Sequence, residues 1–264
     1  MKLDQKQENS SQERFARFAD GYVSSQSHAR GADLDLLVEI AKPQADWLVL
    51  DIATGGGHTA LKFAPYVHQV IATDITPKML SAAEKFIREQ GIMNISFRLA
   101  DAQDLSFDAD TFDLVTCRIA PHHFTDCAGF VQEASRVLKM GGMLVVQDHV
   151  LPEDQAAARY VDNFEHLRDP SHNRAFNSDE WVRMFERAGL KVSHTQEITK
   201  RHQLRPWAER QGCSPQVIAR LILLLREAPP KAAAWLQVED YGLQTVSFVN
   251  HHILIAGIRP LNRV

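Results

Sequence analysis

Strand-like and helix-like segments alternate through the middle of this 264-residue chain, and this alternation limits the fold more than any other feature. Apolar runs bounded by turn residues predict strands, and helical patterns lie between them. The strands are expected at 47–53, 69–75, 95–101, 112–120 and 143–150, and the helices near 58–64, 77–90 and 127–139. Such a pattern is typical of parallel sheets with crossover helices. The sequence therefore predicts an α/β fold with a doubly wound, mostly parallel sheet and helices on both faces.

The segments outside this region are less regular. Before the first strand, Phe15, Phe18 and Tyr22 recur at helical spacing, and a second helical pattern ends at Pro43. After residue 150, a helix is expected at 178–190, with Ser178 as N-cap and Gly189 as C-cap signal. A strand at 191–204, a helical stretch at 214–237 and a last strand at 245–260 follow, the last one irregular around His251 and His252.

Composition limits the partners that the chain can have. The net charge of −4 and the pI near 6.3 provide no basic face, which argues against nucleic acid and favours a small molecule. Three cysteines argue against a disulfide framework and for a reducing compartment. The N-terminus has no apolar segment of the signal-peptide kind, and no apolar run reaches the ~18 residues of a membrane span. We therefore expect a cytoplasmic protein without stable membrane insertion, and the apolar stripe within 217–228 makes a homodimer an additional possibility.

The first predicted strand leads into three consecutive glycines, in the segment "DIATGGGHTA". Glycines permit a tight turn and let a ligand lie directly on the main chain. The helix that follows exposes N–H groups that can receive polar groups of that ligand. Asp51 in this loop would repel a pyrophosphate but attract an ammonium or sulfonium group. The loop therefore favours a positively charged ligand over a phosphate.

Two further carboxylates follow the next two predicted strands. Asp74 lies 17 residues after Gly57, where it can accept both hydroxyl hydrogens of a ribose. Asp101 follows the third strand, where it can accept a hydrogen bond from an adenine amine while the N–H of Ala102 meets a ring nitrogen. Asp104 could replace Asp101 in this role. Together these positions predict a site for an adenine nucleoside.

At these residues the chain resembles the class I S-adenosylmethionine-dependent methyltransferases. The resemblance rests on "VLDIATGGGHTA", "VIATDITPKML", "LADAQDLSF", "FDLVTCRIAPHHF" and "EASRVLKMGGMLVVQD", in that order. It is closest to the branch of ubiquinone/menaquinone-biosynthesis C-methyltransferases, also described as methyltransferase type 11. It implies a seven-stranded, Rossmann-like sheet with an N-terminal helical lid and S-adenosyl-L-methionine as cofactor. It also implies one domain over 1–264, with a helical cap at 1–42, a cofactor-binding core at 43–150 and substrate-side helices and last strands at 151–264.

The resemblance also assigns roles to single residues. It implies that Asp51, Ala53 and Gly55 hold the methionine part of the cofactor, and that Gly57 lets the next helix start close by. The family's usual first glycine is Ala53 here, a departure that we expect the chain to tolerate. The other implied cofactor contacts are Asp74 for the ribose, Ile75 and Met79 against adenine or ribose, Asp101 and Ala102 at the adenine edge, Arg118 after the fourth strand, and Tyr22 and His28 from the N-terminal segment.

Two adjacent histidines stand in the segment "CRIAPHHFTDC". A neutral imidazole can accept a proton from an acidic carbon, phenol or hydroxyl, so His122 or His123 is a candidate general base. Alternatively, one caps the following helix and the other packs. Cys117 and Cys127 do not complete a known zinc spacing with these histidines, so no metal is expected. Further along, Arg174 and Phe176 are candidate contacts for an acidic or aromatic substrate, unless they simply lie on the surface.

These features predict methyl transfer from S-adenosyl-L-methionine to a carbon or oxygen of a small-molecule acceptor. A nicotinamide-dependent oxidoreductase is disfavoured by Asp51 and by Ala60, which stands where the last glycine of a G-x-G-x-x-G motif belongs. A non-catalytic protein that binds S-adenosylmethionine as a sensor or interaction partner has the same sequence features. The sequence alone leaves this second alternative open.

Overall fold

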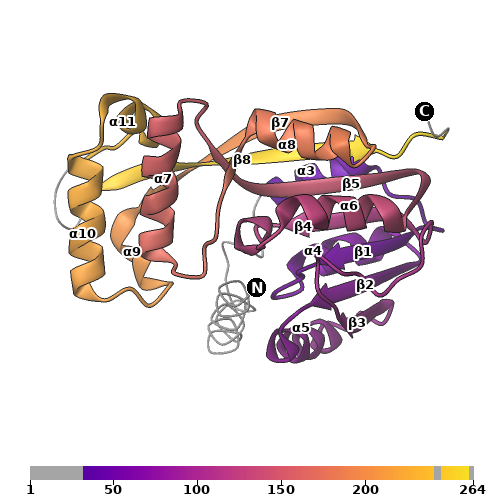
Figure 1. Cartoon of the computed structure of the whole chain (residues 1–264). Coiled ribbons are helices and arrows are strands. Elements are labelled where there is room, and N and C mark those ends of the chain that lie inside the picture. Colours follow the sequence, from indigo (N-terminus) through magenta and orange to yellow (C-terminus); the bar gives the residue numbers. More distant parts are fainter. Residues whose placement is uncertain (1–31, 241–244, 262–264) are drawn as a thin grey trace.

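The computed structural model describes residues 32–240 and 245–261 (Figure 1). Seven strands form the central sheet in the order β3-β2-β1-β4-β5-β8-β7, and the short β6 pairs with β5. Strands β1 to β5 run parallel to one another, whereas β8 is antiparallel to both of its neighbours. The predicted doubly wound, mostly parallel sheet is confirmed. Its strands are β1 (Leu48–Ile52), β2 (Gln69–Asp74), β3 (Ile95–Leu99), β4 (Phe112–Arg118), β5 (Leu138–Leu151), β6 (Phe176–Asn177), β7 (Lys191–Gln203) and β8 (Ser247–Ile258).

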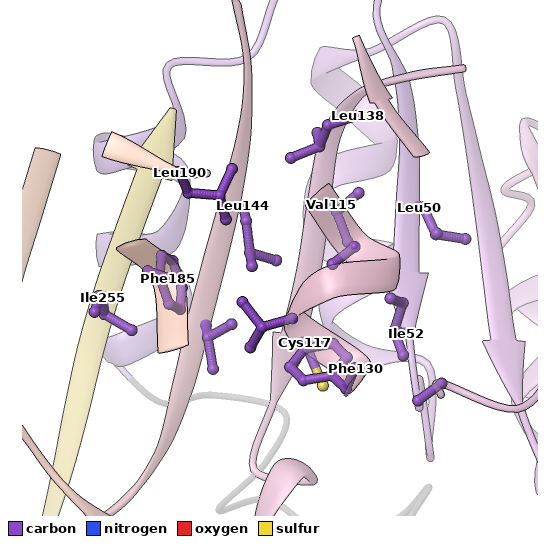
Figure 2. Close-up of a cluster of buried hydrophobic side chains, with 14 of the residues drawn as sticks. Leu50, Ile52, Val115, Cys117, Phe130, Leu138, Leu144, Phe185, Leu190 and Ile255 are labelled. Carbon is purple, nitrogen blue, oxygen red and sulfur yellow. The ribbon is translucent and has the colours of Figure 1, made fainter. Parts of the chain in front are cut away.

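Helices cover both faces of the sheet because successive strand residues point to opposite sides. In β1, Val49 belongs to one apolar cluster and its neighbour Leu50 to another. The first cluster includes residues of α3 (Ala32–Ala41), α4 (His58–Phe63) and α5 (Pro77–Glu89). The second joins Leu50 to Phe130 of α6 (Cys127–Val137) and Phe185 of α8 (Ser178–Arg187), as Figure 2 shows. Both faces of the sheet are therefore buried, as the near-continuous apolar strands require.

Four helices gather at one end of the molecule, and we call them the helical lobe: α7 (Gln155–Arg168), α9 (Leu204–Glu209), α10 (Pro215–Arg226) and α11 (Pro230–Leu236) (Figure 1). β7 and β8 extend from the sheet into this lobe. The lobe has its own apolar cluster, in which Phe164 stacks on Trp207 at 5.6 Å between ring centroids and Phe248 of β8 packs against both. None of the helices in the described ranges is long and apolar enough to cross a membrane.

Three sequence expectations about the later part of the chain differ from the structure. The N-cap of α8 is Asn177 and not Ser178, because Asn177 accepts a hydrogen bond from the N–H of Glu180 while the Glu180 carboxylate accepts from the N–H of Asn177. β8 is regular through His251 and His252, since both residues pair in register with β7. The register shift lies instead in β7, between residues 192 and 194. The expected helical stretch at 214–237 divides into α10 and α11.

The backbone of Gly57 has a left-handed conformation, with φ 80°, in a crowded place between α4 and α5. A Cβ at this position would lie 2.7 Å from Cδ1 of Ile87. Gly91 has a similar φ of 76° but no heavy atom within 4 Å of such a Cβ. We expect Gly91→Ala to lower the free energy of unfolding by about 1 kcal/mol, from backbone strain alone. Gly57→Ala should lower it by about 3 kcal/mol, because overpacking adds to the strain. Urea unfolding followed by circular dichroism measures both, and equal losses would contradict this account.

Ala53 also has a left-handed backbone, with φ 52°, directly after β1. Glycine lacks the Cβ that makes this conformation costly, so Ala53→Gly should raise the free energy of unfolding by roughly 0.5–1 kcal/mol. The same change at Ala134, which is buried in α6, should lower it by about 1 kcal/mol, because glycine weakens a helix. The melting temperature and the free energy of unfolding in urea should therefore rise for Ala53→Gly and fall for Ala134→Gly. A loss of stability in Ala53→Gly would contradict the assigned strain.

Candidate active site

A cavity of about 210 Å³ lies at the carboxyl ends of β1 to β4. The chain turns in opposite directions after β1 and β4, which are neighbours in the sheet, so this is the switch point where ligands bind in open α/β sheets. One part of the lining comes from the ends of β1, β2 and β3, and we call it the strand-end half. Another part comes from the 3-10 helix η2 (Pro121–His123), the end of β5 and the helical lobe, and we call it the lobe half. Its residues are His122, His123, His149, Glu165, Arg168, Asp169, His172 and Gln211.

The glycine-rich loop forms the first wall of the strand-end half. Ala53, Thr54, Gly55 and Gly56 all line the cavity, whereas Gly57 does not. The loop is fixed by backbone hydrogen bonds, from the N–H of Thr54 to the carbonyl of residue 73 at 2.8 Å and from the N–H of Gly57 to the carbonyl of Thr54 at 2.8 Å. Its bare main chain therefore faces the cavity in one defined conformation.

Asp74 lies at the end of β2 and lines the cavity, where the sequence predicted it. Its Oδ1 accepts from the N–H of Thr76 at 2.9 Å and its Oδ2 from the N–H of Gly55 at 3.1 Å. Burial raises the pKa of Asp74, and these backbone N–H groups oppose the rise. Each carboxylate oxygen has a further lone pair. Because the group also lines the cavity, it can accept hydrogen bonds from a pair of adjacent hydroxyls.

Asp101 lines the cavity together with Ala102, Ile75 and Met79. Its Oδ1 accepts from the backbone N–H and the side-chain amide of Gln103, at 2.9 and 3.2 Å. These bonds fix the carboxylate and leave Oδ2 for a ligand. The alternative position, Asp104, is exposed and is not part of the lining. The structure therefore places Asp101, and not Asp104, beside Asp74.

Asp51 does not line the cavity but lies directly behind its wall, with only 1% of its surface exposed. Its Oδ2 accepts from the hydroxyl of Thr54 at 2.6 Å and its Oδ1 from the hydroxyl of Thr116 at 2.8 Å. Burial raises the pKa of Asp51 to about 6, and the two threonine hydroxyls oppose the rise. The carboxylate thus joins the ends of β1 and β4 and acts on the cavity through its charge and through Thr54.

Arg118, at the end of β4, lines the cavity but is already engaged by the protein. Its Nε donates to Asp33 at 2.8 Å and to Gln147 at 3.1 Å. Burial raises the pKa of Asp33, but the Arg118 guanidinium outweighs burial and holds that pKa below its usual range. Asp33 belongs to α3, so the expected ligand contact is also the residue that ties α3 to the sheet.

His122 and His123 both line the lobe half, as members of a cluster of imidazoles. The ring centroid of His122 lies 4.0 Å from that of His123, 4.6 Å from that of His149 and 5.2 Å from that of His172. We call these four residues the histidine cluster. Burial lowers the pKa of His122, His123 and His149, and neighbouring imidazoles lower it further for His122 and His149. These three rings are therefore neutral near pH 7.

A buried acid holds one of these rings from behind. Asp148 accepts from the backbone N–H of His122 at 2.7 Å through Oδ2, and its Oδ1 lies 2.6 Å from Nδ1 of the His122 ring. Burial raises the pKa of Asp148 to about 7. When the Asp148 carboxylate is ionised, the proton of the neutral His122 ring is on Nδ1 and points to Oδ1, which leaves the lone pair of the ring on Nε2. His122 can therefore accept a proton from a ligand in the cavity.

Several residues of this site were not predicted from the sequence. Asp148 and His149 end a predicted strand in "VVQDHV", where a polar pair after an apolar run is a signal that could have been used. Glu165 gives no comparable signal, because α7 reaches the cavity only through tertiary packing, and His172 lies in the turn after that helix. Of the other candidates, Tyr22 and His28 lie outside the described residues.

The two candidate substrate contacts have other partners. Arg174 and Phe176 are not part of the cavity lining. The guanidinium of Arg174 lies over the Phe176 ring, at 4.7 Å from its centroid, and pairs with Glu180. Within the described ranges, no three His, Cys, Asp or Glu side chains are arranged to hold a metal ion.

Known proteins share both the sequence and the fold of this chain. A family model for a methyltransferase domain matches residues 44–189. The uncharacterized methyltransferase YcgJ of Bacillus subtilis is 37% identical over 246 residues, which cover 93% of this chain and 97% of YcgJ. The solved YcgJ structure superimposes with a TM-score of 0.84 at 36% identity, over 87% of this chain and 98% of YcgJ.

A second relative matches half of the chain. The ubiquinone/menaquinone biosynthesis C-methyltransferase UbiE of a Marinomonas species is 34% identical over 135 residues, or 50% of this chain and 54% of the relative. The family model and the near full-length similarity to YcgJ establish the family. Together with the strand order and the position of the cavity, they show that this chain belongs to the class I S-adenosylmethionine-dependent methyltransferases.

Proposed function

We propose that this enzyme transfers the methyl group of S-adenosyl-L-methionine to a carbon or oxygen atom of a small-molecule acceptor. The observation that carries the proposal is that one cavity joins a nucleoside-like set of groups to a buried acid–imidazole pair. The nucleoside set is Asp74, Asp101 and Ala102, and the pair is His122 with Asp148. Such a pair suits the removal of a proton from an acceptor that is methylated in the same cavity.

The residues of the strand-end half fit the cofactor. Asp74 has acceptor capacity for the two ribose hydroxyls, and Asp101 has Oδ2 for the adenine amine. Ile75 and Met79 supply apolar surface beside them. The bare loop around Gly55 would receive the methionine part, while the charge of Asp51 behind it favours a cation. When bound, S-adenosylmethionine supplies a methyl group that is already activated by its sulfonium.

The protein's own task is then to align the acceptor and to receive its proton. Alignment of two bound reactants can contribute ~7–11 kcal/mol toward lowering the barrier. His122 would act as the general base through Nε2, because burial keeps its ring neutral near pH 7. Asp148 would be a positioning residue that fixes the ring through Nδ1. His123 lies against His122, and its Nδ1 is 3.0 Å from the carbonyl oxygen of Ser171.

The function is tested with cofactor that has a trideuterated methyl group and with a metabolite extract freed of macromolecules. We expect release of S-adenosylhomocysteine and a labelled product with the methyl group on carbon or oxygen, as mass spectrometry can determine. A label on nitrogen would contradict the assigned acceptor atom. No release of S-adenosylhomocysteine by a protein that binds the cofactor would leave the non-catalytic alternative.

The role of His122 is tested with the product found in this way. Removal of a general base lowers kcat by ~10²–10⁴-fold. We expect a loss in this range for His122→Gln, with an unchanged KM for the cofactor, and a smaller loss with an altered pH profile for Asp148→Asn. His68→Gln is the matched control, because His68 is exposed and far from the lining. Equal activity of His122→Gln and His68→Gln would show that no imidazole base is needed at this position.

A further inference from the structure

The lobe half of the cavity is polar throughout. Every described side chain that we assign to it is an imidazole, a carboxylate, a guanidinium or an amide. The apolar residues of the lining belong to the strand-end half, such as Ile75 and Met79, or to the segment directly after β4, such as Ile119 and Phe124. Among the described residues, the part of the cavity that lies beyond the proposed cofactor site is therefore lined by side chains that end in hydrogen-bonding groups and by no aliphatic side chain.

These polar groups are held in place by the helical lobe. Nε2 of His172 lies 2.7 Å from Oδ1 of Asp162, and Oδ2 of Asp169 accepts from the Gln211 amide at 2.8 Å. The guanidinium of Arg168 lies over the Trp207 ring, at 3.9 Å from its centroid. Glu165 is only 5% exposed. Glu165, Asp169 and His172 are buried and Arg168 and Gln211 are half-buried. Because their bonds hold these side chains, they do not turn aside to make an apolar surface for a hydrocarbon ligand.

The charges of the lobe half nearly balance. Its carboxylic side chains are Glu165 and Asp169, and its cationic groups are the guanidinium of Arg168 and the imidazole of His172, which pairs with Asp162 behind the lining. Burial lowers the pKa of His172, but its bond to Asp162 outweighs burial and raises that pKa, while burial also raises the pKa of Glu165. A ligand with a large charge of either sign would leave part of this set unmatched. Hydroxyl groups, in contrast, can donate to carboxylates and accept from cations.

The geometry points to a compact, hydroxyl-rich and nearly neutral acceptor that has no prenyl or acyl tail. This inference rests on the proposed function, in which the lobe half is the acceptor's side of the cavity. A hydrocarbon tail placed there would displace water from these polar groups without replacing the hydrogen bonds that water makes to them. This loss is unfavourable for each polar group. An acceptor with several hydroxyls would replace them.

Methyl gallate and dodecyl gallate test this inference, because they share the trihydroxyphenyl head and differ only in the ester chain. Binding of each is measured by calorimetry, below the concentration at which dodecyl gallate aggregates, with and without S-adenosylhomocysteine. We expect methyl gallate to bind at least tenfold more tightly than dodecyl gallate. Tighter binding of dodecyl gallate, or no binding of either compound, would overturn the inference.

Variants of Glu165 connect this preference to the lobe half. Glu165→Leu should shift the affinity ratio at least tenfold toward dodecyl gallate, whereas Glu165→Gln, which keeps a polar group, should leave the ratio close to that of the wild type. Glu153→Leu is the matched control, because Glu153 is exposed and outside the lining. An unchanged ratio in a folded Glu165→Leu protein would also overturn the inference.

The gallate titrations, together with a titration of S-adenosylhomocysteine, distinguish failure of this inference from failure of the proposed function. Binding of S-adenosylhomocysteine itself is measured in its own experiment. Failure of the nucleoside to bind while methyl gallate binds would contradict the proposed function and support the polar ligand class. Binding of S-adenosylhomocysteine together with tighter binding of dodecyl gallate would support the proposed function and contradict the polar ligand class.

Discussion

A buried carboxylate at the point where the sheet changes direction holds the site together. Asp51 bonds to Thr54 after β1 and to Thr116 within β4, so it links these two paired strands close to the point where their connections leave in opposite directions. The residues just beyond them, Ala53 and Ile119, both have left-handed backbones, with φ 52° and 54°. Such conformations are costly for residues with a Cβ, and for Ile119 in particular because it is β-branched. The cavity wall thus stores backbone strain that the hydrogen bonds of the sheet must offset.

The site also depends on the position of the helical lobe. It has its own apolar cluster around Phe164 and Trp207, and this packing sets the position of α7 against the end of β5. As a result, Glu165 and His172 come close to His149 and His122, which belong to other elements. Because the rings are packed together and buried, the protein keeps most of them neutral. Neutral imidazoles can both donate and accept hydrogen bonds, which suits a site for proton transfer and for a polar acceptor.

Much of the core could be predicted because it depends on local patterns. Apolar runs separated by helical segments fix a parallel sheet, and the carboxylates at 74 and 101 follow their strands at distances that place them on one edge. The spacing could not show that Asp51 lies behind the wall, since a residue near a strand end can point either way. In the lobe half, His122 and His123 were predicted, but Glu165 and His172 escaped prediction for another reason. Glu165 and His172 belong to a helix and a turn whose place is set by packing against β5 and α10, and no local periodicity encodes that contact.

In the proposed complex, the cofactor's adenine lies against the loop after β3, and calorimetric titration with S-adenosylhomocysteine is the sharpest test of this placement. The matched variants are Asp101→Ala, which removes a cavity carboxylate, and Asp104→Ala, which removes an exposed one three residues away. A hydrogen bond to a charged group contributes about 1.5–3 kcal/mol, so Asp101→Ala should weaken binding by roughly 10- to 100-fold. Asp104→Ala should bind as the wild type does. Equal affinities of the two variants would contradict the placement of the cofactor.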